Sequence, residues 1–293
     1  MRIHLKHRLL KYRLITAVIL IPIVTAALFL LPLMGFVCLI LLVCMLSAWE
    51  WGRLAGLTSL SQRIWLAIIF GFFLAFISLR ISPSRPFLSL WQAKYTLWTA
   101  LGWWISALIL LLCYPCSARF WRKSRLLRLI FGLLTILPFF WGMLALRQYH
   151  YDINHFSGAW WVLYVMVLVW SADSGAYIFG RMFGRHKLAQ TISPRKTWEG
   201  VIGGLITSVV ITCFFKKYSP IHAELHALFL SSIISIIAGM LGDLTESMFK
   251  REAGIKDSGY VIPGHGGILD RIDSLTAAVP VFICLMFLTF HAI

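Results

Sequence analysis

Charged residues are scarce in this sequence, and acidic residues are the scarcest of them. Only 13% of the 293 residues are charged, and 27 lysines and arginines outnumber 11 aspartates and glutamates. Hydrophobic residues make up 60% of the chain, and its mean hydropathy is +0.83. So little charge excludes an ordinary soluble domain of this length. The composition predicts an all-α, polytopic integral membrane protein.

Several familiar catalytic motifs are also missing. The sequence has no GxxxxGK[ST] phosphate loop, no HExxH zinc motif, no GxSxG nucleophile motif and no dinucleotide fingerprint. It has no internal repeat with a period of about 20 to 50 residues, so we expect a single membrane domain, 1–293. Within it, residues 1–150 read mainly as scaffold spans, whereas residues 159–293 carry the polar groups.

Nine apolar segments approach the roughly 20 residues that a membrane-crossing helix needs. These predicted spans cover roughly residues 13–31, 34–49, 64–80, 96–114, 127–147, 159–179, 199–215, 227–248 and 273–291.

The net charge of +16 follows this topology rather than indicating nucleic-acid binding. With a cytoplasmic N-terminus, 21 of the 27 lysines and arginines lie in inside segments and six in outside loops. This is the bias that the positive-inside rule expects. We therefore predict a cytoplasmic N-terminus and no nucleic-acid partner, and a basic inner face that favours anionic membrane lipids.

The few charges gather in one segment. Between Asp243 and Asp273, 31 residues hold six acids and four lysines or arginines, whereas the other 262 residues share 28 charged side chains. Charged groups beside apolar helices are costly unless they pair or bind an ion, so this segment is the candidate site. Glu246 and Lys250 are spaced to pair on one helix face, but Asp243 lies deeper and needs another partner.

A glycine-rich loop at 252–269 interrupts the helices of this segment. It ends in PGHGG, with His265, Gly266 and Gly267, and leads into a helix that starts near Asp270. Asp270 and Asp273 could simply complement the helix dipole. Glycines at a helix N-terminus also form an anion cradle, and carboxylates with substrate phosphates usually hold Mg²⁺, so we expect a phosphate and a divalent cation here.

A second polar segment runs from Asp173 to Gly200. Ser193 and Pro194 read as the N-cap and first residue of the seventh span, which would place Lys196 and Thr197 in its first turn. A lysine there opposes the helix dipole unless an anion is bound. For Asp173 the expected partners are a metal, Arg181 or a polar residue of the last two spans.

Together these residues resemble the phosphatidate cytidylyltransferase (CDP-diacylglycerol synthase) family. The likeness extends to ADSGAYIFGRMFGRHK and SPRKTWEGVIGG, and the length and hydropathy look like those of bacterial inner-membrane members. The positions that match its long signature are Ser247, Phe249, Lys250, Arg251, Lys256, Asp257, Gly259, Ile262, Pro263, His265, Gly266, Gly267, Asp270, Arg271 and Asp273.

The resemblance implies that CTP and phosphatidate react to give CDP-diacylglycerol and pyrophosphate with Mg²⁺, a second cation being an open alternative. It implies a homodimer in the bacterial inner membrane, with a site open to the cytoplasm and the bilayer. It also implies that Asp243 and Asp270 ligate the metal, while Lys250, Arg251, Lys256 and the SPRKT segment hold phosphates.

Roles for the other candidates follow from the same picture. We expect Ser193, Lys196, Thr197, Ser247, Gly266 and Gly267 to bind substrate, and His265 to contact or orient a phosphate rather than act as a base. Arg271 and Asp257 join the catalytic set and Asp173 and Asp273 the metal set, but structural pairing stays open for all three acids. The alternatives are a transporter that uses Asp173, Asp243 and Asp270 as ion or proton sites, and a related transferase acting on another polyprenyl or lipid phosphate. A membrane scaffold would leave the pattern of glycines and carboxylates unexplained.

Overall fold

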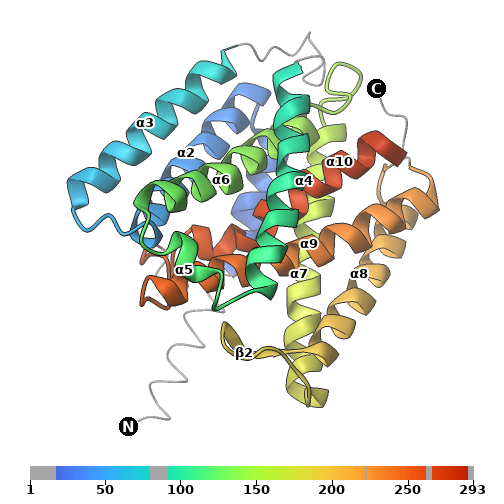
Figure 1. The fold of residues 1–293 in the computed structure, drawn as a ribbon. Coiled ribbons are helices and arrows are strands. Elements are labelled where there is room, and N and C mark those ends of the chain that lie inside the picture. The colour runs from blue at the N-terminus through green and yellow to red at the C-terminus, as the bar shows by residue number, and fades with distance from the viewer. Residues whose placement is uncertain (1–17, 80–90, 222, 262–265, 290–293) are drawn as a thin grey trace.

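The computed structural model describes residues 18–79, 91–221, 223–261 and 266–289. It is a bundle of long helices (Figure 1) with one short strand pair. Among the described residues, eight helices are long and apolar enough to cross a membrane, and the apolar helix Val18–Leu30 precedes them. The predicted all-α polytopic architecture is confirmed. Of the nine predicted spans, the beginning of the first (residues 13–17) and the ends of the third (residue 80) and the ninth (residues 290–291) lie outside the described residues.

The chain order alternates long helices with short connections. The elements are α2 (Leu33–Leu54), α3 (Leu60–Ser78), α4 (Trp91–Leu112), α5 (Ala118–Trp121), α6 (Arg125–Gln148), α7 (Ser157–Phe183), β1 (Lys187–Ala189), β2 (Ser193–Thr197), α8 (Trp198–Tyr218), α9 (Leu225–Glu252) and α10 (Leu269–Thr289). Helices dominate because a backbone in lipid must satisfy its own hydrogen bonds.

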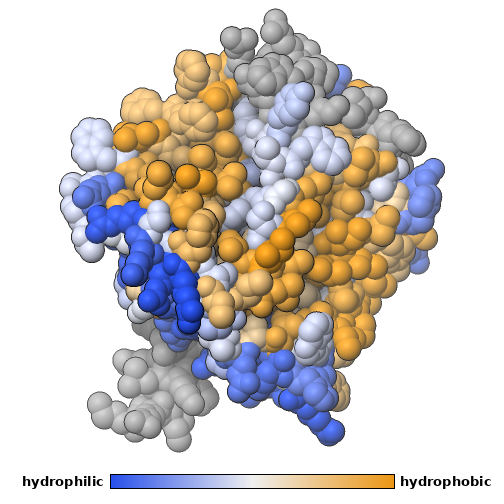
Figure 2. Space-filling view, in the orientation of Figure 1, coloured by the Kyte–Doolittle hydropathy of each residue, from blue (hydrophilic) through white to orange (hydrophobic). Residues whose placement is uncertain are grey.

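Helices α6 and α10 form the centre of the bundle, whereas α3 is the most exposed of the long helices. Helix α10 packs on α9, and α7 packs closely on α8. Small residues allow α7 and α8 to approach each other closely: a Cβ added at Gly203 of α8 would collide with Phe179 of α7. Figure 2 shows hydrophobic residues over most of the visible face, with hydrophilic residues toward its lower part and its edges.

The expected break between α9 and α10 is confirmed. Helix α9 ends at Glu252, and Gly254 adopts a left-handed conformation (φ +68°) that terminates it, with the Ile255 N–H donating to the Lys250 carbonyl. Helix α10 starts at Leu269. The connecting loop lies at the same end of the bundle as α5 and the strand pair, the lower end in Figure 1.

The predicted start of the seventh span is wrong. Ser193 and Pro194 do not begin a helix; they open β2, which pairs antiparallel with β1. Helix α8 begins at Trp198, and its N-cap is Thr197, whose hydroxyl accepts the Gly200 N–H at 3.2 Å. Lys196 therefore projects from a strand rather than from the first turn of a helix.

Candidate active site

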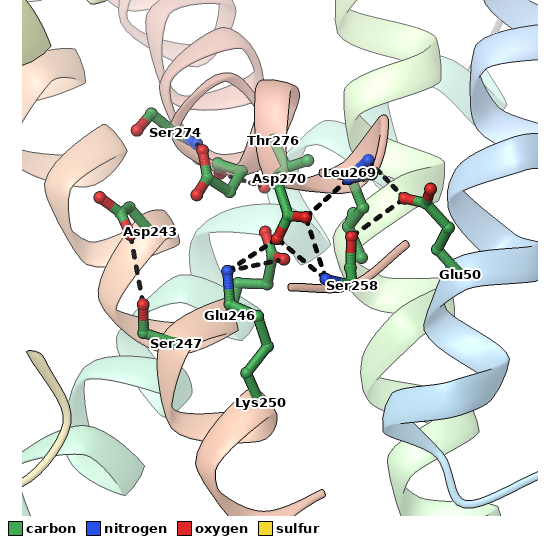
Figure 3. A network of polar contacts seen from close by, with 12 residues as sticks. Glu50, Asp243, Glu246, Ser247, Lys250, Ser258, Leu269, Asp270, Ser274 and Thr276 are labelled. Carbon is green, nitrogen blue, oxygen red and sulfur yellow. Dashed lines mark hydrogen bonds and ion pairs between the residues drawn. The ribbon is translucent and has the colours of Figure 1, made fainter. Parts of the chain in front are cut away.

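A buried lysine between two carboxylates forms the centre of the candidate site (Figure 3). The Nζ of Lys250, on α9, lies 3.2 Å from Glu246 Oε1 and 2.9 Å from Asp270 Oδ1 of α10. The side chains of Lys250, Glu246 and Asp270 are only 11%, 4% and 7% exposed. The predicted pairing of Glu246 with Lys250 is confirmed, and Lys250 also joins the two helices.

Asp270 fastens the glycine loop as well. Its carboxylate accepts the Ser258 N–H at 2.9 and 3.1 Å and the Gly267 N–H at 2.8 Å. With Lys250, three donors occupy its two oxygens, which satisfies most of the acceptor capacity of a carboxylate. One anion held just before α10 is thus the protein's own Asp270.

Glu50 of α2 holds the same loop from the other side. This glutamate is fully buried, and its oxygens accept the Ile268 N–H at 3.0 Å, the Leu269 N–H at 2.8 Å and the Ser258 hydroxyl at 3.0 Å. The loop backbone comes so close that a Cβ at Gly259 or Gly267 would collide with the Glu50 carboxylate. Glu50 thus supplies the charge that the first N–H groups of α10 favour.

A second ion pair joins the strand pair to α9. Lys196 Nζ of β2 lies 2.5 Å from Asp243 Oδ2, and Ser247 contacts the other Asp243 oxygen at 3.4 Å. The expectation that Asp243 needs a partner is confirmed. Asp173 and Asp273 lie close enough to Asp243 for their charges to repel it. Three acidic side chains therefore gather near Lys196, and the charges of Lys250 and Arg271 also reach this group.

The remaining predicted residues lie around these two clusters. Arg251 is exposed, and its Nε donates to the Ile192 carbonyl at 3.0 Å, which ties α9 to the strand pair. Lys256, Asp257 and Arg271 are exposed. Gly266 has a φ of +86°, which favours glycine. His265 lies outside the described residues.

Ser193 and Thr197 have local roles in the strand pair. Ser193 is half-buried opposite Ala189, and Thr197 is buried as the α8 cap. Arg181, one expected partner of Asp173, places its Nη1 3.2 Å from the Tyr177 hydroxyl instead.

The donor chemistry of the second cluster fits a hard cation. Among the described residues, no three His, Cys, Asp or Glu side chains converge closely enough to hold a metal ion by themselves. Mg²⁺ is usually held by one or two carboxylates and completed by water and substrate phosphates. Asp173, Asp243 and Asp273, whose charges influence one another, are the carboxylates that could contribute to such a site.

Sequence reasoning missed Glu50 and Ser258. Ser258 is buried and uses its N–H for Asp270 and its hydroxyl for Glu50, while its carbonyl accepts Arg53 Nη1 at 3.0 Å. A signal for Glu50 was present, because it is an isolated acid directly after the predicted span 34–49.

The fold and these clusters define a polytopic membrane protein with a densely charged site at one end of its helix bundle. The model of the cytidylyltransferase family matches residues 11–289. The chain belongs to the cytidylyltransferase family.

Relatives in this family cover nearly all of the chain. The phosphatidate cytidylyltransferase of Haemophilus influenzae is 44% identical over 283 residues, which are 94% of this chain and 97% of the relative. The enzyme of the same name from Pseudomonas aeruginosa is 44% identical over 280 residues, covering 95% of this chain and 97% of the relative. That of Staphylococcus epidermidis is 43% identical over 142 residues, 48% of this chain and 54% of the relative.

Replacing Lys250 by methionine should destabilise the protein strongly. The substitution leaves Glu246 and Asp270 buried without their cation, and breaking a buried pair in this way costs about 3–5 kcal/mol. Thermal unfolding in detergent measures the loss. Lys123→Met, at an exposed lysine, is the matched control and should change stability by less than about 0.5 kcal/mol. Equal unfolding temperatures for the two variants would contradict the structural role of Lys250.

Replacing Glu50 by glutamine should lower the free energy of unfolding by about 1–3 kcal/mol. Whichever carboxylate oxygen the amide NH₂ replaces, that NH₂ faces a buried N–H or O–H donor from which it cannot accept a hydrogen bond. The matched control is Glu224→Gln at an exposed position, which should have little effect. The measurement is again unfolding in detergent, together with proteolysis of the loop. A Glu50→Gln protein as stable and as protected as the control would show that the loop does not depend on this carboxylate.

Proposed function

We propose that this protein transfers the CMP group of CTP to phosphatidate, giving CDP-diacylglycerol and pyrophosphate. The observation that carries the proposal is the convergence of the two polar segments: Lys196 of the SPRKT segment pairs with Asp243, while Lys250 and Asp270 join α9 to α10 beside them. The identity with relatives that are named phosphatidate cytidylyltransferase, over almost the whole chain, supports the same reaction.

The chemistry follows from charge. A phosphate oxygen of phosphatidate attacks the α-phosphorus of CTP, a new P–O bond forms, and the bond to the leaving pyrophosphate breaks. The nucleophile is already an anion at neutral pH, so the reaction depends on positioning and charge neutralisation rather than on a strong base. Lys196 and the exposed Arg195, Arg251 and Lys256 are the cations available to phosphates at this end of the bundle.

Lys196 is the proposed exchangeable contact. Its ion pair with Asp243 is partly exposed, with side chains 27% and 26% accessible, whereas the pairs of Lys250 are nearly closed to solvent. An incoming phosphate can therefore compete for Lys196 more readily than for Lys250. In this proposal Lys250 positions Asp270 and the loop, and Lys196 contacts substrate.

The proposal includes Mg²⁺. Asp243 and Asp270 are the pair that the family resemblance assigns to the metal, and Asp173 and Asp273 add carboxylates near Asp243. The oxygens of Asp270 already accept from Lys250, Ser258 and Gly267, so Asp243 is the more available ligand. When bound, the ion would neutralise phosphate charge and polarise the transferring phosphoryl group.

The proposed setting is the bacterial inner membrane, with the site on the cytoplasmic side and a homodimer as the assembly. The distribution of lysines and arginines supports this orientation. A site at one end of an apolar bundle suits a reaction between a water-soluble nucleotide and a lipid headgroup.

The test is to incubate the purified full-length protein in detergent with labelled CTP, phosphatidate and Mg²⁺ and to extract the lipid. We expect a labelled liponucleotide that requires all three components. Chelation by EDTA should abolish the product, and added Mg²⁺ should restore it. A wild-type preparation that is folded yet transfers no label to lipid would refute the proposed function.

Asp243→Asn and Asp270→Asn should each lower turnover about 100-fold or more, since each removes charge placed for the transferring phosphates and their cation. Asp243→Asn should also raise the Mg²⁺ concentration needed for half-maximal rate. Membrane insertion should persist in both. Glu224→Asn, far from the site in the sequence and exposed, is the control. Near-normal turnover of either aspartate variant would remove that residue from the proposed machinery.

A further inference from the structure

A recess with two arginines lies beside the glycine loop. It has a volume of about 390 Å³ and is lined by Trp49, Arg53, Arg63, Gly259, Tyr260 and Val261. Its walls come from the end of α2, the start of α3 and the described part of the loop. Neither arginine belongs to the family signature or to the clusters around Lys250 and Lys196.

Arg63 is held in place but keeps unused hydrogen-bond donors. Its Nε donates to the Trp49 carbonyl at 3.2 Å, and its guanidinium lies 4.2 Å from the centre of the Trp49 ring. Its Nη2 is buried without a hydrogen-bond partner in the described part of the chain. A buried donor without an acceptor is unusual in a folded protein and indicates a missing ligand or water.

Arg53 faces the same recess from α2. Its Nη1 donates to the Ser258 carbonyl, and its guanidinium lies 5.5 Å from the centre of the Tyr260 ring. The two arginines are close enough for their charges to repel each other. Two neighbouring guanidiniums held by carbonyls and aromatic rings leave their planar donor edges for an anion.

No carboxylate of the described residues forms an ion pair with these two arginines, although the charge of Glu50 reaches Arg63. Glu50 is the nearby acid, but its oxygens already accept from Ser258, Ile268 and Leu269. Arg63 also lies near the N-terminal end of α3, where a cation opposes the helix dipole and an anion is favoured.

The recess borders the most lipid-accessible helix. Helix α3 packs mainly on α2 and exposes large apolar side chains along its length, including Leu60, Ile64, Trp65 and Ile69 next to Arg63. An anion that reaches Arg63 beside these side chains can carry acyl chains. A free nucleotide would gain nothing from that apolar border.

We propose that this recess binds the phosphate of a lipid headgroup. It thereby receives phosphatidate next to the glycine loop that Asp270 and Glu50 hold in place. The phosphate accepts hydrogen bonds from Arg53 and Arg63, and the acyl chains lie along α3. The identity of the lipid rests on the proposed function, whereas the site itself rests on the two arginines and their surroundings.

The primary test is Arg63→Gln. Arg63 hydrogen-bonds to the Trp49 carbonyl and not to the glycine loop, so this substitution leaves the hydrogen bonds of the loop in place. In mixed micelles, we expect the half-saturating surface concentration of phosphatidate to rise about 10-fold, the loss of roughly 1.4 kcal/mol of charge-assisted hydrogen bonding. The kcat and the KM for CTP should stay within about twofold of wild type, since a binding contact acts on one substrate. Arg119→Gln, at an exposed arginine of α5, is the matched control and should change none of these values.

A binding measurement separates this proposal from the reaction. Without CTP or Mg²⁺, dihexanoyl phosphatidate should raise the unfolding temperature of the wild type and of Arg119→Gln, and raise that of Arg63→Gln much less. Dihexanoyl phosphatidylcholine should produce no such difference. Equal shifts in all three proteins, with an unchanged phosphatidate KM, would refute the recess.

The other outcomes are equally decisive. A rise in the KM for CTP alone would assign the recess to the nucleotide and overturn the lipid proposal. A lower unfolding temperature of Arg63→Gln than of the wild type, without any lipid, would show that the arginine is structural. That result would also overturn the lipid proposal. If the wild type forms no liponucleotide but the lipid-dependent shift still requires Arg63, the proposed function fails and the recess stands.

Discussion

Two buried carboxylates hold the loop between α9 and α10 from opposite sides, and the candidate site depends on that constraint. Asp270 takes the N–H groups of Ser258 and Gly267, and Glu50 takes those of Ile268 and Leu269. A loop beside an apolar bundle cannot rely on water for its backbone donors, so these acceptors decide its course. Lys250 then offsets the charge of Asp270 and fixes its position relative to α9. The geometry of the site thus depends on a few charged side chains, each of which has several partners.

The two lysines divide the acids into clusters of different character. Around Lys250 the charges are enclosed and paired, which favours a fixed geometry. Around Lys196 the ion pair is partly open, and Asp173 and Asp273 lie near enough to Asp243 for their charges to interact with it. Phosphates could approach charged carboxylates there only with a cation, because like charges in a poorly solvated site repel strongly. The closed cluster therefore serves as support, and the open cluster is where ions can exchange.

Much of this arrangement could be predicted from the sequence. The spans follow from bilayer thickness and hydropathy, the break after Glu252 from its glycines, and the Glu246–Lys250 pair from helical spacing. The strand pair could not, because Ser193 and Pro194 are typical of a helix start, yet Thr197 supplies the cap and Pro194 is tolerated in a short strand that need not use its N–H. The role of Glu50 was also hidden. Its partners lie more than 200 positions away and are mostly backbone N–H groups, which leave no pattern in residue types.

Ser258 shows how the parts are coupled. Its N–H binds Asp270, its hydroxyl binds Glu50 and its carbonyl binds Arg53, so one buried residue contacts α10, α2 and the edge of the arginine recess at once. A shift of the loop toward any one partner must lengthen a bond to another, since Ser258 is fully buried and its N–H, hydroxyl and carbonyl are all engaged. The positions of Asp270 and Arg53 are therefore linked through this residue, and an anion bound in the recess would act on the same loop that Asp270 holds at the candidate site. For a reaction that brings a lipid phosphate to a nucleotide, such a shared loop ties the arrival of one substrate to the geometry that meets the other.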